Sequence, residues 1–237
     1  MQMKLISFSI VAAAGMITCA TADPAATKEA DSKDSKTISL FDGKTLNGWK
    51  KVGGTGEYKV EDGCIVGFGK NVKGNTFLRT EKTYGDFELT FEFKFDDLSG
   101  NSGLMFRALQ KPSKDGNGRV YGYQCEGDNG KDRAWTAGLY DEARRGWLYP
   151  HKTSKEDAEK RKEFTAQGQK ITKWDGWNTI VIRCKGNHIQ TWLNGEKRVD
   201  FTDTDKKHDT REGFFGLQVH GGKSCNVRWR NIQLKQL

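Results

Sequence analysis

The sequence is poor in residues that interrupt strands and in residues that build metal centres. Its 237 residues include three prolines, four histidines and five cysteines, and they contain no Cys-x-x-Cys pair. We therefore do not expect a structural zinc site, which needs four Cys or His ligands at short spacings. No other metal or cofactor is expected, except that Asp203 and Asp205 could contact calcium. A single Asp-x-Asp in a polar stretch is more often plain surface.

Long apolar segments are missing beyond the N-terminus, so no transmembrane segment is expected. Lys4 precedes an apolar stretch over residues 5–17, which is too short to span a bilayer comfortably. The small residues Ala20-Thr21-Ala22 then suit a signal peptidase. These features predict a signal peptide over residues 1–22 and export to the periplasm or the medium.

Cys19 raises the alternative of a lipoprotein, which would be acylated at that cysteine. Met16 and Thr18 fit the lipoprotein cleavage motif poorly, so soluble export is favoured. Cleavage after Ala22 leaves four cysteines, and an even number in an oxidising compartment permits three disulfide pairings. Two of them, Cys125 and Cys184, lie on apolar faces of predicted strands, where a free cysteine acts as a small hydrophobe.

The net charge of +8 is spread along the chain rather than gathered in one block. A nucleic-acid partner is therefore not expected, because such partners are bound by clustered Lys and Arg. Charged residues make up 30% of the sequence and aromatic residues 11%, which is typical of a soluble domain with a real core. The oligomeric state stays open.

Short alternating runs separated by glycine turns predict an all-β fold. Residues 23–36 contain almost no large apolar side chain and are expected to form a disordered linker. Residues 37–237 then form one domain, with strands predicted over 58–60, 64–66, 87–95, 103–109, 120–126, 179–184, 188–193, 213–220 and 225–234. Because no βαβ alternation occurs, we expect a two-sheet antiparallel β-sandwich of jelly-roll or concanavalin type.

One short charged helix interrupts this pattern. Ser154 followed by Asp157 resembles a capping box, and residues 155–164 are nearly all charged. This composition predicts a solvated surface helix within an insertion.

Strand alternation brings a set of polar residues together on the side away from the core. In the strand predicted over 103–109, the Arg107 side chain is expected to point to the face opposite that of Leu104 and Phe106. In the next strand, Gln124 and Glu126 alternate with apolar neighbours. Gln218 and His220 do the same near the C-terminus. Glycines beside these positions leave room for a ligand. If the strands are neighbours, the side chains converge on one site; the alternative is an ordinary solvent-facing side.

Asp128 continues the parity of Glu126 and would lie about 6.6 Å from it along a regular strand. That separation is within the range of paired carboxylates in glycoside hydrolysis, although the spacing is common by chance. An arginine such as Arg107 close to Glu126 would keep the carboxylate ionised and suited to act as a base.

Residues 132–150 are unusually rich in aromatic and arginine side chains for a loop. Aromatic faces stack on sugar rings, while Arg and Asp form directed hydrogen bonds to hydroxyl groups, so the segment predicts a site for a small carbohydrate or other polyol. The alternative is that some of the aromatic residues cover the edge of the core. The candidate ligand-binding residues are Arg133, Trp135, Tyr140, Asp141, Arg144 and Trp147.

Six short motifs follow one another in order over residues 38–237. They are Phe41-Asp42-Gly43-Lys44-Thr45-Leu46-Asn47-Gly48-Trp49, Asn101-Ser102-Gly103 with Arg107, Gly122-Tyr123-Gln124-Cys125-Glu126, Trp177-Asn178, Trp192-Leu193-Asn194-Gly195, and Gly216-Leu217-Gln218-Val219-His220-Gly221 followed by Arg230-Asn231-Ile232. Together they resemble the motifs of the 3-keto-disaccharide hydrolase family, whose fold is a concanavalin-like jelly roll. In most members a Glu stands where this sequence has Gln124 and a Gln where it has Glu126. The segment 132–150 is similar to that of a subgroup sharing this reversal.

The resemblance implies cleavage of sugars already oxidised at C3. A carbonyl at C3 acidifies the hydrogen on C2, so a base can remove it, the C1 substituent leaves by elimination, and water adds back. On this reading Glu126 or His220 is the base, and Arg107 and Arg145 stabilise the enolate oxygen. Gln218 and Tyr140 would then orient hydroxyl groups.

Two other readings of the same residues stay open. The domain could be a non-catalytic carbohydrate-binding module, which would bind sugars without forming product. It could also be an interaction domain whose basic surface meets acidic polysaccharide, with binding that is lost in moderate salt.

The hydrolase reading predicts that Glu126→Gln abolishes turnover of a 3-keto-glucoside and leaves the fold intact, because only the basic oxygen is lost. Product formation by the variant and by the wild type, with circular dichroism as the check on folding, tests this. Turnover like that of the wild type would remove Glu126 from the mechanism.

Overall fold

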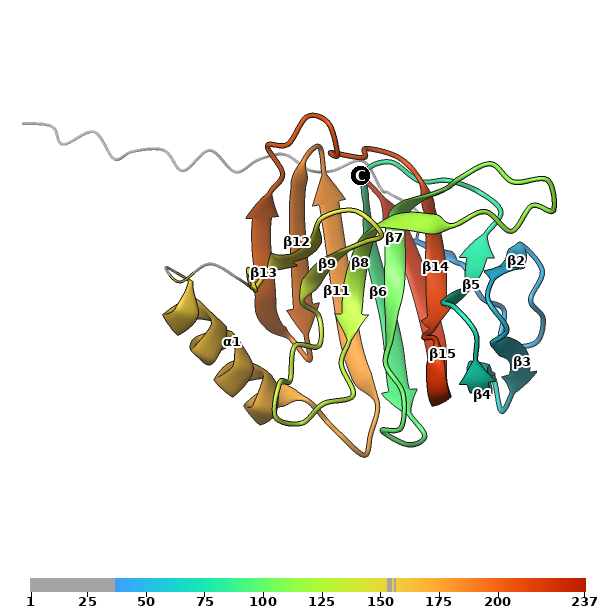
Figure 1. Cartoon of the computed structure of the whole chain (residues 1–237), viewed down its shortest axis with the longest axis horizontal. Coiled ribbons are helices and arrows are strands. Elements are labelled where there is room, and N and C mark those ends of the chain that lie inside the picture. The colour runs from blue at the N-terminus through green and yellow to red at the C-terminus, as the bar shows by residue number, and fades with distance from the viewer. Residues whose placement is uncertain (1–36, 153–154, 156) are drawn as a thin grey trace, which may run out of the picture. The chain divides into compact units, whose positions relative to one another are not determined.

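The strand predicted over 87–95 is present with those bounds as β6 (Phe87–Phe95), and it lies inside one of two antiparallel sheets (Figure 1). Its odd positions except Phe95 are buried and its even positions are partly exposed, because successive side chains point to opposite faces. The computed structural model describes residues 37–152, 155 and 157–237.

Three sequence-based predictions fall outside the described residues. They are the signal peptide over residues 1–22, the linker over residues 23–36, and the role of Ser154 in a capping box. Export and the cleavage site therefore stay predictions. In the part of the chain that is described, no helix has the length and apolar character needed to cross a bilayer.

Within the described residues, one sheet has eight strands in the order β13-β12-β11-β6-β15-β4-β3, and β1 also pairs with β15. Its other strands are β1 (Thr37–Ser39), β3 (Glu57–Glu61), β4 (Cys64–Val72), β11 (Asn178–Lys185), β12 (His188–Leu193), β13 (Glu196–Thr202) and β15 (Gly222–Gln236). The hairpin predicted around Asp62-Gly63 joins β3 to β4, and Asn194-Gly195 turns β12 into β13.

The second sheet has seven strands in the order β10-β9-β8-β7-β14-β5-β2 in the same described part. These strands are β2 (Trp49–Gly53), β5 (Thr76–Thr80), β7 (Ser102–Gln110), β8 (Val120–Gly127), β9 (Leu139–Glu142), β10 (Gly146–Tyr149) and β14 (Phe214–Val219). The two antiparallel sheets confirm the predicted all-β sandwich.

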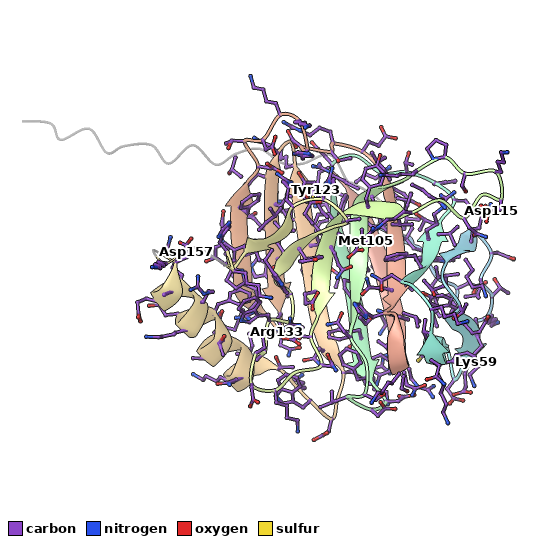
Figure 2. The ribbon with its side chains drawn as sticks, in the orientation of Figure 1. Lys59, Met105, Asp115, Tyr123, Arg133 and Asp157 are labelled. Atoms are coloured by element: carbon purple, nitrogen blue, oxygen red, sulfur yellow. The ribbon has the colours of Figure 1, made fainter. Side chains whose placement is uncertain are left out.

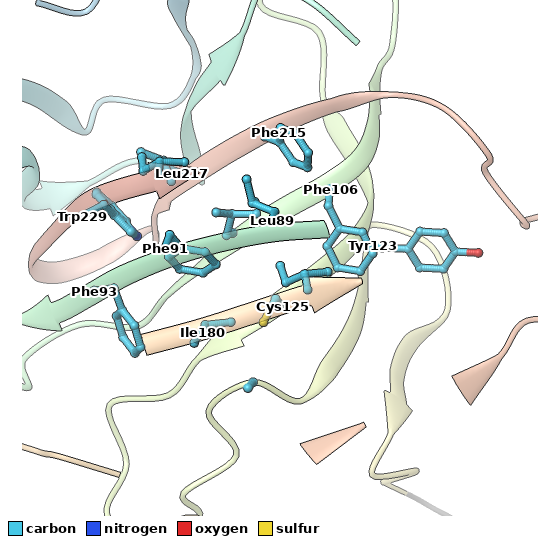
Figure 3. Close-up of a cluster of buried hydrophobic side chains, with 14 of the residues drawn as sticks. Leu89, Phe91, Phe93, Phe106, Tyr123, Cys125, Ile180, Phe215, Leu217 and Trp229 are labelled. Carbon is cyan, nitrogen blue, oxygen red and sulfur yellow. The ribbon is translucent and has the colours of Figure 1, made fainter. Parts of the chain in front are cut away.

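The inward faces of both sheets form an aromatic core (Figure 3). The rings of Phe87 and Phe215 meet edge to face with centroids 4.8 Å apart, and those of Phe106 and Tyr123 stack at 5.6 Å. Such pairs contribute about 0.5–1.5 kcal/mol beyond their buried area. These contacts therefore pack the seven-stranded sheet against the eight-stranded sheet.

The four cysteines of the described residues are free and buried. Cys125, Cys184 and Cys225 belong to the aromatic core, which confirms that Cys125 and Cys184 lie on apolar strand faces. None of the three possible disulfide pairings is formed.

The helix is longer and less solvated than the sequence predicts. It is α1 (Ala158–Ile171), and it buries Phe164 and Gly168. The buried Arg198 guanidinium lies 3.4 Å from the centre of the Phe164 ring and donates hydrogen bonds to the carbonyls of Ala134, Thr136 and Phe164. A side chain at residue 168 would collide with the Ala134 carbonyl, so glycine permits this close approach.

The segment 132–150 is a strand hairpin in its second half rather than a loop throughout. β9 and β10 pair with each other, and β9 also pairs with β8. The turn between them uses left-handed backbone at Ala143 (φ 58°) and Gly146 (φ 77°). These short strands were missed because four-residue runs that contain charged side chains show little periodicity.

The sandwich predicts that Phe215→Ala lowers the free energy of unfolding by about 3–5 kcal/mol, because it leaves a cavity between Phe87 and Tyr84. Denaturant titration measures this. Ile38→Ala is the matched control, since Ile38 is 40% exposed and its truncation should change stability by no more than about 0.5 kcal/mol. Equal effects of the two substitutions would contradict the assignment of the core.

Candidate functional site

The outer face of the seven-stranded sheet carries a polar hollow of about 450 Å³. Residues from β8, β9 and β10 and from the ends of β7 and β14 line it. They are Asn101, Gln124, Glu126, Asp128, Asn129, Gly130, Arg133, Tyr140, Glu142, Trp147 and His220, and the space is called here the Glu126 hollow. Gln124, Glu126 and His220 therefore lie together, as strand parity predicts. Volumes of this size suit small ligands.

Strand pairing explains why these side chains converge. Gln124 pairs with Tyr140, and Gly122 pairs with Glu142, so alternate residues of β8 and β9 share the outer face. Gly103 in β7 pairs with Glu126. An added Cβ at Gly103 would lie 2.8 Å from Cγ of Gln124. The missing side chain thus makes room for Gln124, rather than for a ligand directly.

Glu126 is a buried carboxylate surrounded by hydrogen-bond donors. Oε1 accepts from Asn101 Nδ2 at 2.7 Å and from Arg133 Nη2 at 2.9 Å, and Oε2 accepts from Gln124 Nε2 at 3.1 Å. Burial raises the pKa of Glu126 to about 7, although the Asn101 hydrogen bond and the charge of Arg133 act in the opposite direction. The sequence-based prediction placed Arg107 beside Glu126 as the cation that keeps it ionised. The neighbouring cation is Arg133 instead, and the effect of burial on the pKa is larger than that of its charge.

A chain of two amides leads from Glu126 into the protein. Gln218 Nε2 donates to Gln124 Oε1 at 2.9 Å, and Gln124 donates to Glu126. Gln218 is fully buried, and within the described part of the chain its Oε1 has no hydrogen-bond partner. Gln218 supports Gln124 from behind the hollow and does not line it.

Asp128 holds Arg133 in place. Its carboxylate accepts from Arg133 Nε at 2.8 Å and from Nη2 at 2.9 Å, and also from the backbone N–H groups of Gly130 and Trp135. Arg133, labelled in Figure 2, thereby joins Asp128 to Glu126. Strand β8 ends at Gly127, before Asp128, and the two carboxylates share one guanidinium instead of facing each other across an open gap.

Two aromatic rings border the hollow, and a third lies behind them. Tyr140 and Trp147 line the hollow with ring centroids 5.3 Å apart. Trp135 is 7% exposed, belongs to the core and packs edge to face on Trp147 at 4.7 Å. Burial raises the pKa of the Tyr140 phenol, with further contributions from Glu142 and Glu126, so its hydroxyl stays protonated at neutral pH. Trp135 supports Trp147 rather than binding a ligand itself.

His220 lies one residue beyond β14 and is exposed. Its Nδ1 lies 2.7 Å from the carbonyl oxygen of Gly221, and the Gly221 N–H donates to Asn75 Oδ1 at 3.0 Å. The imidazole therefore reaches the hollow from a turn that Asn75 fixes.

Arg107 does not lie in the hollow, which corrects the parity prediction. The pairing of β7 with β8 shifts between Phe106 and Leu109, and Arg107 has a left-handed backbone with φ of 44°. This bulge turns the side chain inward, because the extra residue breaks the alternation. The guanidinium is buried against Asp86 Oδ1 at 2.7 Å and the carbonyls of Gly85 and Gly186.

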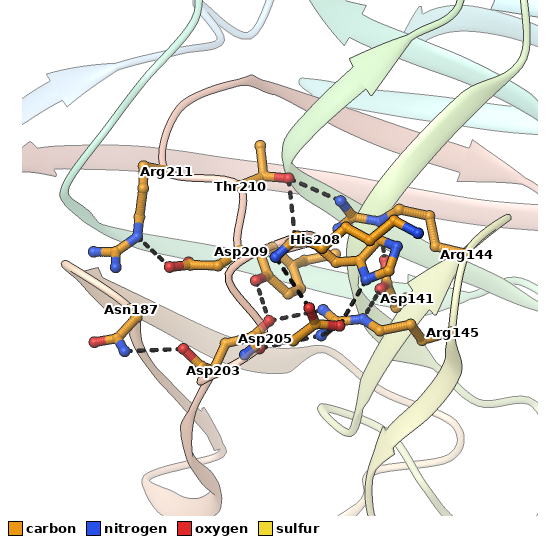
Figure 4. A network of polar contacts seen from close by, with 12 residues as sticks. Asp141, Arg144, Arg145, Asn187, Asp203, Asp205, His208, Asp209, Thr210 and Arg211 are labelled. Carbon is orange, nitrogen blue, oxygen red and sulfur yellow. Dashed lines mark hydrogen bonds and ion pairs between the residues drawn. The ribbon is translucent and has the colours of Figure 1, made fainter.

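Asp141, Arg144 and Arg145 are not among the lining residues of the hollow. They belong to a separate network of polar contacts, which Figure 4 shows. Asp141 accepts from Arg144 Nε at 2.6 Å and from Arg145 Nε at 2.5 Å. Arg145 continues to Asp203 at 2.7 Å, and Tyr123 also donates to Asp203. Asp141 alternates with Tyr140 and Glu142 in β9, so it points to the opposite side. These residues, with Asp203, form the Asp141 network, which ties the β9–β10 hairpin to the connection between β13 and β14.

The carboxylates considered for calcium are engaged in the same network. Arg145 Nη1 lies 3.1 Å from Asp203 Oδ1 and 3.4 Å from Asp205 Oδ2. Burial alone would raise the pKa of Asp203, but hydrogen bonds from Arg145 and Tyr123 lower it below its ordinary value. Among the described residues, no three His, Cys, Asp or Glu side chains are grouped to hold a metal ion.

Four lining residues of the hollow were not predicted from the sequence as site residues: Asn101, Asn129, Gly130 and Glu142. Asn129 and Gly130 directly follow Asp128 and carried no signal of their own. Asn101 precedes β7 and donates to Glu126, and its only signal was its place in a motif. Glu142 shares the parity of Tyr140, so recognising β9 as a strand would have found it.

Comparison with known proteins supports the resemblance read from the sequence. A family model of the 3-keto-alpha-glucoside-1,2-lyase-like domain matches residues 36–235. A protein of Bacteroides thetaiotaomicron named 3-keto-disaccharide hydrolase is 36% identical over 90 residues, which cover 34% of this chain. The match spans 30% of that relative's length.

Solved structures share the fold at low sequence identity. A protein of Parabacteroides distasonis proposed to be a glycosyl hydrolase gives a TM-score of 0.54 at 21% identity, covering 85% of this chain and 94% of its own. The carbohydrate-binding module CBM66 of Bacillus subtilis gives 0.51 at 17%, covering 80% and 96%. A Bacillus subtilis protein of unknown function with a galectin-like fold gives 0.54 at 11%, covering 81% and 90%.

The raised pKa of Glu126 predicts a stability contribution that decreases as the pH rises. Between its ordinary pKa of 4.5 and the folded value of about 7, the folded protein binds more protons than the unfolded chain. The contribution is therefore complete below pH 4.5 and is lost through pH 7. Relative to Glu126→Gln, the wild type should lose on the order of 3 kcal/mol of unfolding free energy between pH 4 and pH 8. A difference that does not change with pH, measured by denaturant titration, would contradict the burial of an ionisable group.

Proposed function

Because the chain belongs to the family of the 3-keto-alpha-glucoside-1,2-lyase-like domain, we propose that it cleaves glycosides whose C3 hydroxyl has been oxidised to a ketone. The observation that carries the proposal is Glu126, a buried carboxylate with a pKa of about 7 at a hollow lined by aromatic and polar groups. A base whose pKa lies near the operating pH combines the correct protonation state with a strong affinity for the proton.

The reaction begins with proton transfer from C2 to Glu126. The electron pair of the C2–H bond forms a C2=C3 double bond, and the negative charge moves to the oxygen on C3. The enolate then expels the C1 substituent with its bonding electrons, which leaves a C1=C2 double bond conjugated with the C3 ketone. Addition of water across that double bond completes a net hydrolysis, and no oxocarbenium ion is formed.

In this proposal Arg133 is the cation that stabilises the enolate oxygen. Arg107 and Arg145 are held elsewhere, whereas Arg133 lines the hollow and lies 2.9 Å from Glu126. Asp128 and the face of Trp147, 5.3 Å away, fix the guanidinium before substrate enters. Preorganised positive charge of this kind is often worth several kcal/mol in the transition state.

His220 and the aromatic rings complete the proposed assignment. The exposed imidazole of His220 lines the hollow and is suited to give a proton to the departing oxygen, because histidine is the side chain that most often serves as a general acid. Trp147 presents a ring to a sugar face, and the Tyr140 hydroxyl donates to a sugar oxygen. Asn101 and Gln124 keep the Glu126 carboxylate oriented through their hydrogen bonds.

Deuterium incorporation tests the proton transfer at C2. In D₂O the wild type should release a 3-keto-sugar carrying deuterium at C2, because hydration of the C1=C2 double bond takes that hydrogen from solvent. Mass spectrometry and NMR of the product measure it, and the unoxidised glucoside serves as the control that should not react. The value of kcat/KM should rise with pH through about 7 as Glu126 ionises.

Product without deuterium at C2 would exclude elimination. Binding of both sugars without any product would instead favour the alternative of a non-catalytic carbohydrate-binding module.

A further inference from the structure

A second hollow of about 430 Å³ adjoins the Glu126 hollow on the same sheet face. Its lining comes from β5, from the turn before β5 and from the start of β8, and it includes Asn75, Phe77, Arg119 and Val120. Glu142 lines both hollows, so the two spaces are neighbours that share this residue.

Glu142 is a nearly buried carboxylate with unused hydrogen-bonding capacity. The residue is 9% exposed, yet its protein contacts are long: 3.4 Å from Asn75 Nδ2 and 3.8 Å from Arg119 Nη2, both to Oε1. Within the described residues no hydrogen bond to Oε2 is found, and this oxygen is not one of the buried atoms left without a partner, so it is accessible. Glu142 can therefore accept a hydrogen bond from a ligand without losing a close protein partner.

The other polar groups of the second hollow face the same space. The Arg119 side chain is 68% exposed and carries donors that no close acceptor occupies in the described part of the protein. Asn75 accepts from the N–H of Gly221, which places the second hollow beside the turn that carries His220. Phe77 and Val120, both 2% exposed, belong to the apolar cluster beneath this face of the sheet.

We propose that the second hollow binds the sugar ring on the far side of the scissile bond, and that Glu142 and Arg119 recognise its hydroxyl groups. A carboxylate that accepts and a guanidinium that donates can hold adjacent hydroxyls in fixed directions. The lining combines apolar surface from Phe77 and Val120 with the polar groups of Asn75, Arg119 and Glu142, and this combination suits a sugar ring, which has both apolar faces and directed hydroxyl groups. The inference rests on the proposed function, since it places the oxidised ring beside Glu126. It assigns the second ring to a space next to His220, where the departing oxygen must be protonated.

The test compares a 3-keto-disaccharide with methyl 3-keto-glucoside, which lacks the second ring. Arg119→Ala should lower kcat/KM for the disaccharide about tenfold or more and change the value for the methyl glycoside less than twofold, since a charged hydrogen bond to the second ring is lost. Glu142 borders both hollows, so Glu142→Gln should lower kcat/KM for the disaccharide more than kcat/KM for the methyl glycoside. Arg211→Ala is the control: it removes an exposed arginine that pairs with Asp209 and lines neither hollow. This substitution should leave kcat/KM unchanged for both substrates.

Calorimetry with the unoxidised disaccharide and methyl glucoside separates this inference from the proposed chemistry. The wild type should bind the disaccharide more tightly, and Arg119→Ala should abolish that preference, whether or not either keto-sugar is turned over. Equal losses on both sugars, or no loss on the disaccharide, would overturn the second-ring site. Absence of turnover in the wild type together with the predicted binding pattern would overturn only the proposed reaction.

Discussion

The burial of the Glu126 carboxylate on the outer face of the seven-stranded sheet is the constraint around which the site is built. A charge removed from water is costly unless donors surround it. Asn101, Gln124 and Arg133 supply these donors from three different segments. Their number is sufficient to hold the carboxylate in place and insufficient to keep its pKa at the ordinary value, so burial leaves Glu126 a stronger base than an exposed glutamate.

Successive side chains of β9 point to opposite faces of the sheet, so this short strand both lines the hollow and anchors the hairpin. Tyr140 and Glu142 face the hollow, while Asp141 points to the other side and binds Arg144 and Arg145. The Asp141 network fixes the hairpin to the connection after β13, and α1 is held to residues 134–136 through Arg198. Of the arginines in residues 132–150, Arg144 and Arg145 thus anchor the hairpin that forms one wall of the site, and Arg133 lines the hollow.

Sequence reasoning predicted the strands with regular alternation, such as β6 and β8, and hence the shared face of Gln124 and Glu126. It misplaced Arg107, because a bulge leaves no mark in the alternation of apolar and polar residues. Arg145 was misplaced because its partner Asp203 is 58 residues away along the chain. The reversed order of Gln and Glu, read from the family motif, proves to be a small displacement. Both positions line one hollow and are joined by a hydrogen bond.

The two amides behind Glu126 have a consequence for its exchange of protons. An amide carries an acceptor at one corner and donors at the other, so a half-turn of Gln124 and Gln218 reverses the polarity of the whole relay. In one orientation Gln124 donates a hydrogen bond to the ionised carboxylate of Glu126. In the reverse orientation it accepts a hydrogen bond from the protonated carboxylic acid. Gln218 Oε1 has no hydrogen bond within the described structure, so a half-turn breaks none at that end. Both protonation states of Glu126 can therefore be solvated by the same two side chains without moving the backbone.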